Sequence, residues 1–168
     1  MLFFACLSDS AFSQLFEPFE IRYQNAQKGG IRFLSNVAIS CSSGNCSSLQ
    51  SQMPPFGNGA NDNQNMQFVD IDSDFSTFMS TSDSLDLENC SEILWAGLYW
   101  SGEISTGTQG YANRDKVKLS VNAEPYQDII AEETIDISGI SHPSYNCFKD
   151  ITSIVQNAGI KARFTVAN

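Results

Sequence analysis

The sequence is poor in positive charge and has no long hydrophobic run. Nine of its 168 residues are Lys or Arg, against 19 Asp or Glu, which gives a formal net charge of −10. Contacts to nucleic-acid phosphates need a basic patch, so this composition argues against a nucleic-acid partner. The uncharged stretch at residues 93–100, which holds both tryptophans, is too short to span a membrane.

Signatures of catalysis are also scarce. His142 is the only histidine, and the chain has no Gly-x-Ser-x-Gly nucleophile elbow, phosphate-cradling glycine loop or nicotinamide fingerprint. The adjacent carboxylates Glu132 and Glu133 would face opposite ways in a strand, so they cannot act as a pair. We therefore expect a protein that is not an enzyme.

Residues 1–14 resemble the end of a secretory signal. Leu2 to Leu7 form a short apolar core, and Ala11-Phe12-Ser13 places small residues at the positions that a signal peptidase reads. The usual basic region before the core is missing, so a buried N-terminal strand or helix is the alternative. We expect an exported, extracellular chain whose mature domain spans residues 15–168.

The cysteines are consistent with export. Cleavage of the signal would remove Cys6 and leave four cysteines, and an even number in an exported chain predicts two disulfides with three alternative pairings. We favour Cys41–Cys46, which flanks a Ser-Ser-Gly-Asn turn, together with Cys90–Cys147. Zinc is a poor alternative, because the chain has no C-x₂-C pair and a single histidine.

Alternating apolar and polar residues, separated by clusters of turn residues, predict a β-rich domain. Gly29-Gly30 predicts a hairpin turn between two strands, at residues 20–24 and 31–39, and a long polar loop follows at residues 41–65. Further strands are predicted at residues 66–72, 84–87, 116–121, 126–130, 134–137 and 161–167.

Two segments complete the predicted architecture. Residues 93–100 are rich in aromatic and apolar side chains and predict a strand buried on both faces. Residues 148–156 have apolar side chains at helical spacing and predict one short helix. The expected fold is an all-β, antiparallel, jelly-roll-like β-sandwich with one short helix, in a domain that continues beyond residue 168.

Asp70, Asp72 and Asp74 form the sharpest polar motif. In an extended segment these carboxylates would point to one face, where they repel each other unless a cation neutralises them. Calcium, which prefers six to eight oxygen ligands, is the natural partner. The alternative is a solvated strand end and turn.

Aromatic side chains offer a second kind of binding site, because aromatic rings can stack on the apolar faces of sugars. The candidates are Tyr99, Trp100, Tyr111 and Tyr145. Most aromatic residues in a small β domain belong to the core, which is the alternative for each of them.

A family resemblance is carried by residues 30–36, 70–74, 85–87, 90–100, 145–155 and 164–168. These segments resemble a domain near the N-terminus of large Bacteroidetes cell-surface, adhesin-like and gliding-motility-associated proteins. The resemblance implies secretion by the type 9 system, further domains in the same chain, no catalytic residues, and adhesion, recognition or spacing at the cell surface with a glycan or protein ligand. A carbohydrate-binding or carbohydrate-active jelly roll is the alternative function.

Overall fold

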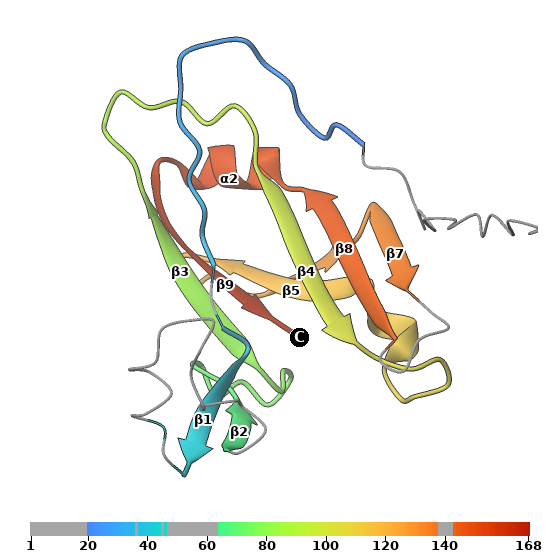
Figure 1. The fold of residues 1–168 in the computed structure, drawn as a ribbon. Coiled ribbons are helices and arrows are strands. Elements are labelled where there is room, and N and C mark those ends of the chain that lie inside the picture. Colours follow the sequence, from blue (N-terminus) through green and yellow to red (C-terminus); the bar gives the residue numbers. More distant parts are fainter. Residues whose placement is uncertain (1–19, 36, 45, 47–63, 138–142) are drawn as a thin grey trace, which may run out of the picture.

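Two antiparallel sheets packed against each other form the body of the protein in the computed structural model (Figure 1). The structure describes residues 20–35, 37–44, 46, 64–137 and 143–168. The expected all-β sandwich with one short helix is confirmed. The predicted signal segment, residues 1–14, lies outside the described residues.

The larger sheet has four strands in the order β3-β9-β5-β6. Lys116 and Lys118 of β5 point away from the core, whereas Val117 and Leu119 are buried, as expected for a strand with one solvated face. The strands span Ser80–Asp86 (β3), Lys161–Ala167 (β9), Lys116–Val121 (β5) and Gln127–Ile130 (β6).

The smaller sheet has three strands in the order β4-β8-β7, so β4 and β7 are its edges. Tyr99 of β4 pairs with Phe148 of β8, and Trp100 pairs with Cys147. The strands span Gly97–Glu103 (β4), Ser144–Asp150 (β8) and Glu133–Ile137 (β7).

Four short elements complete the fold. A separate two-stranded sheet pairs β1 (Ile39–Ser43) with β2 (Asn65–Phe68), and a 3₁₀ turn, η2, covers Tyr111–Asn113. The helix α2 (Thr152–Ala158) follows β8 directly and leads into β9 (Figure 1).

The core lies between the two main sheets and beneath α2. Leu98 and Trp100 of β4 pack against it from the three-stranded sheet. Leu119 is its most deeply buried large side chain, with 1% of its surface exposed. The other buried members are Leu85, Val117, Ile129, Ile151, Val155, Ala162 and Phe164.

The predicted hairpin before residue 39 is wrong. Residues 20–24 and 31–35 form no strand, and β1 begins only at Ile39. Among the described residues, no neighbouring strand pairs with residues 31–35. The side chains of Ile31 and Phe33 are therefore 84% and 85% exposed. An alternating pattern makes a strand only where another strand satisfies its main-chain groups.

Two other boundaries differ from the prediction. The strand expected at residues 93–100 begins at Gly97, and Tyr99 is 60% exposed, so β4 is not buried on both faces. The helix expected from residue 148 begins at Thr152, because Phe148 lies in β8, which pairs with both β4 and β7. A carboxylate oxygen of Asp150 accepts a hydrogen bond from the Thr152 amide and marks this boundary.

Candidate recognition site

Four aromatic rings form a row on the outer face of the three-stranded sheet. Tyr99 contacts Phe148 with ring centroids 5.0 Å apart, and Phe148 stacks on Trp95 at 6.3 Å. Trp95 in turn stacks on Tyr23 of the N-terminal segment at 5.8 Å. Phe148 is buried beneath its neighbours, whereas Tyr99 and Tyr23 at the two ends are exposed. The row therefore presents two accessible rings, Tyr99 on the sheet itself and Tyr23 on the N-terminal segment that packs against Trp95.

Glycine at position 97 lets the row form. A Cβ atom built on Gly97 would lie 2.5 Å from the ring of Trp95 and 2.9 Å from the ring of Phe148. These separations are far below van der Waals contact, so a larger residue would push both rings away. The Trp-Ala-Gly sequence thus turns Trp95 back over the start of β4.

Charged side chains border the aromatic row. The guanidinium of Arg22 lies 4.7 Å from the centre of the Phe148 ring and forms an ion pair with Glu133. Lys149 of β8 donates to Glu132, the residue before β7, across 2.7 Å, and this hydrogen bond lowers the pKa of the Glu132 carboxyl. Glu132 and Glu133 are thus engaged with two different cations.

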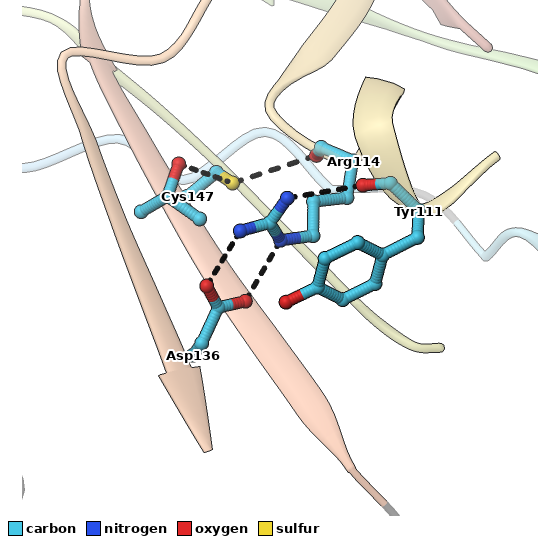
Figure 2. Close-up of polar contacts among 5 residues, drawn as sticks. Tyr111, Arg114, Asp136 and Cys147 are labelled. Atoms are coloured by element: carbon cyan, nitrogen blue, oxygen red, sulfur yellow. Dashed lines mark hydrogen bonds and ion pairs between the residues drawn. The ribbon is translucent and has the colours of Figure 1, made fainter. Parts of the chain in front are cut away.

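A second polar cluster joins η2 to β7 (Figure 2). Arg114 donates from Nε and Nη2 to the two carboxylate oxygens of Asp136, across 2.8 and 2.6 Å. Its Nη1 donates to the Tyr111 carbonyl, and the guanidinium lies 4.1 Å from the centre of the Tyr111 ring. The bidentate pair lowers the pKa of Asp136 and raises that of Arg114. This cluster holds a loop onto the sheet.

The carbonyl oxygen of Arg114 accepts two further hydrogen bonds. The indole nitrogen of Trp100 donates to it across 3.0 Å, and the thiol of Cys147 donates across 3.5 Å. The Cys147 sulfur also lies 3.4 Å from the Thr134 hydroxyl, and burial raises the pKa of the Cys147 thiol. The Cys147 thiol is therefore buried and protonated, and it packs in the core with its polar contacts made to Arg114 and Thr134.

The predicted disulfides have two different outcomes. Cys41 and Cys46 are joined, with their Cα atoms 5.6 Å apart, which confirms the first pairing. The Cys90–Cys147 pairing is wrong, because both residues carry free thiols. Cys147 points into the core beside Trp100, whereas Cys90 is exposed in a turn before β4.

The aspartates of the 70–74 segment lie in a turn and not in an extended strand, because β2 ends at Phe68. Asp70 accepts hydrogen bonds from the Ser73 amide and the Ser80 hydroxyl. Asp74 accepts one from the Ser76 amide. The premise that their carboxylates share one strand face is therefore wrong.

Asp72 contacts the loop between β5 and β6, where Tyr126 lies. Its carboxylate accepts hydrogen bonds from the Tyr126 hydroxyl and the Asp74 amide, and the Tyr126 bond lowers the pKa of Asp72. In the described part of the chain, no three acidic, histidine or cysteine side chains are grouped to hold a metal. Calcium binding at Asp70, Asp72 and Asp74 stays a prediction from the sequence.

Of the four predicted sugar-stacking residues, Tyr99 is the exposed one. Trp100, Tyr111 and Tyr145 are half-buried, and Tyr145 packs over Gly102. Sequence reasoning missed Tyr23 and Arg22, whose positions depend on the path of a segment without strand structure. His142 lies outside the described residues.

The comparisons with known proteins add no identification. No family model, no curated protein and no solved structure matches this chain. No helix in the described ranges is long and apolar enough to cross a membrane.

Proposed function

We propose that this chain is a non-enzymatic, exported recognition domain of an adhesin-like cell-surface protein. The observation that carries the proposal is the row of rings from Tyr23 to Tyr99 on the outer face of the three-stranded sheet. Exposed aromatic rings on a rigid support lose little side-chain entropy on binding, which favours recognition.

The polar groups support a binding role over a chemical one. Arg114 forms an ion pair with Asp136. Glu132 pairs with Lys149, and Glu133 pairs with Arg22. Ion pairs of this kind join neighbouring elements. The Cys41–Cys46 disulfide supports an oxidising compartment, since structural disulfides persist mainly outside the cytosol.

Carbohydrate binding is the second candidate, and Tyr99 favours it. The ring is 60% exposed, and Phe148 supports it from the paired position on β8. A ring fixed in this way can stack on the apolar face of a sugar. A protein ligand would use the same surface without competition from free glycans.

Export is tested on intact cells of the source organism. An antibody against the domain should label unpermeabilised cells, and added protease should remove the signal. Labelling only after permeabilisation would contradict export. Non-reducing peptide mapping of the same material should recover Cys41 joined to Cys46.

Recognition is tested with the purified domain on arrays of glycans and of surface proteins. Tyr99→Ala should abolish the strongest binding, and Phe75→Ala is the matched control, because Phe75 is a fully exposed ring in a turn outside the three-stranded sheet. Competition by the soluble sugar would assign a glycan ligand. Binding that survives Tyr99→Ala, or is lost equally in both variants, would contradict the proposed site.

A further inference from the structure

One long side of β4 has no partner strand in the described part of the chain. Ala96 accepts a hydrogen bond from the Ile151 amide, and the Ile104 amide donates to Pro143, so the even-numbered residues of this segment direct their main-chain groups toward β8. Main-chain direction alternates along an antiparallel strand. The N–H and C=O groups that point to the free side belong to Gly97, Tyr99 and Ser101.

The other edges of the two main sheets carry the features that normally prevent pairing with another chain. Unprotected edges template added strands, and charged side chains block this. β6 carries Asp128, and β7 carries Glu133 and Asp136. β3 carries Asp83, and its edge is approached by residues 32–35. β4 has no charge and no proline from Gly97 to Gly102, and its one charged residue, Glu103, ends the strand. Among the edges of the two main sheets, β4 is therefore the least protected.

The N-terminal segment offers a complementary strand. Ile31, Arg32 and Phe33 alternate as in a strand, yet Ile31 and Phe33 are 84% and 85% exposed. The segment runs past β3 as the blue coil of Figure 1. Its main chain pairs with no strand among the described residues. Each molecule therefore has two unpaired stretches of main chain, residues 31–35 and the free side of β4.

Charge also matches the segment to the edge. Residues 31–35 contain one cation, Arg32, and no Asp or Glu, although the whole chain has a net charge of −10. Glu92 precedes β4 and Glu103 ends it. A basic, apolar segment is therefore attracted to this edge, whereas another acidic strand would be repelled.

Within one copy, the segment is held at the other sheet. The Ser35 amide donates to Asp83 across 3.2 Å, and Arg32 donates to the Asp86 carbonyl across 3.5 Å. Both acceptors belong to β3 of the four-stranded sheet, and β4 belongs to the three-stranded one. These contacts favour a partner edge from a different molecule.

We propose that the free edge of β4 binds residues 31–35 of a second copy as an added strand, so that two copies exchange segments reciprocally. The added main-chain hydrogen bonds would satisfy Gly97, Tyr99 and Ser101, and the exchange would cover Ile31 and Phe33. Each copy supplies one segment and one edge, so the assembly closes as a two-fold dimer. This inference is independent of the proposed function.

Sedimentation and light scattering of the purified protein over a range of concentrations test the proposal. We expect a concentration-dependent dimer. Ser101→Lys places a charge at the free edge and Phe33→Asp places one on the segment, so each should raise the dissociation constant about tenfold or more. Ile130→Lys is the matched control, because it adds the same charge to an exposed position of the β6 edge.

A monomer at every concentration, or a dimer unaffected by Ser101→Lys, would overturn the proposal. The melting temperature of each variant is compared with that of the original protein, which distinguishes loss of the dimer from loss of the fold. Tyr99→Ala keeps the main-chain groups of β4, so failure of ligand binding and failure of dimerisation are seen separately.

Cross-linking identifies the occupant of the edge. Two proteins, one with Phe33→Cys and one with Ser101→Cys, are prepared with Cys6 and Cys90 changed to Ser, mixed, and treated with a short bismaleimide. A cross-linked species containing one copy of each protein supports exchange. If a chain with both new cysteines gives only an internal cross-link, the segment pairs with its own β4, and the exchange is excluded.

Discussion

The indole ring of Trp95 lies so close to Gly97 that a Cβ at position 97 would be 2.5 Å from it. Trp95 is thereby sandwiched between the start of β4 and Tyr23, and it reaches Phe148 on the neighbouring strand. The N-terminal segment is thus attached to the three-stranded sheet through a ring whose position depends on the absence of a side chain.

Gly97→Ala should destabilise the protein by about 1–3 kcal/mol, because the new methyl group displaces two packed rings. The measurement is the free energy of unfolding in denaturant, together with tryptophan fluorescence. Gly30→Ala is the matched control, since a Cβ there meets no atom within 4 Å. Equal stability of the two variants would contradict the packing described for Trp95.

The two free thiols should differ in reactivity. Cys90 is exposed and should be alkylated in the folded protein, whereas Cys147 is buried and its raised pKa keeps the thiol protonated. Alkylation followed by peptide mapping assigns the label to each cysteine, and denaturant should expose Cys147. Recovery of a Cys90–Cys147 disulfide peptide from native protein would contradict the structure.

The Arg114–Asp136 pair predicts a loss of stability in acid. The pair lowers the pKa of Asp136 below its unfolded value of about 4, so its stabilisation is present above that pH and is lost as the pH falls through the folded pKa. Asp136→Asn should cost about 1 kcal/mol at neutral pH. The difference from the original protein should shrink as the pH falls.

Denaturant melts from neutral to acidic pH measure this effect. Asp86→Asn is the control, because Asp86 pairs with Lys161 across 3.4 Å and both side chains are mostly exposed. A difference between Asp136→Asn and the original protein that stays constant down to pH values of about 2 would exclude the assigned ion pair.

Calcium binding at Asp70, Asp72 and Asp74 is tested by melting the protein with calcium and with a chelator. A cation bound only by the folded state would raise the melting temperature, and Asp72→Asn would remove the rise. Identical melting temperatures under both conditions would contradict the prediction.

The sequence was sufficient for those parts of the fold that depend on local pattern. The alternation of Lys116 to Val121 predicted β5, and the spacing of Cys41 and Cys46 around a turn predicted their disulfide. In both cases the decisive residues are close together in the chain. Local periodicity and turn chemistry therefore carried the information.

The remaining features depend on contacts between distant segments. Phe148 has helical spacing with Ile151, yet pairing of β8 with two strands makes it part of a sheet. Cys147 points toward Trp100 and not toward Cys90 because of the strand register. Tyr23 and Arg22 join the aromatic row through the path of a segment without regular structure. No local pattern specifies these relations.

The oxygen that accepts from both Trp100 and Cys147 belongs to the main chain of Arg114. Every amino acid at position 114 would supply that oxygen, whereas arginine alone supplies the two-pronged contact with Asp136. A substitution at position 114 would therefore remove the ion pair with Asp136 but keep the main-chain oxygen that accepts from Trp100 and Cys147. Natural variation at this position could exchange the surface charge without loosening the tryptophan beneath it.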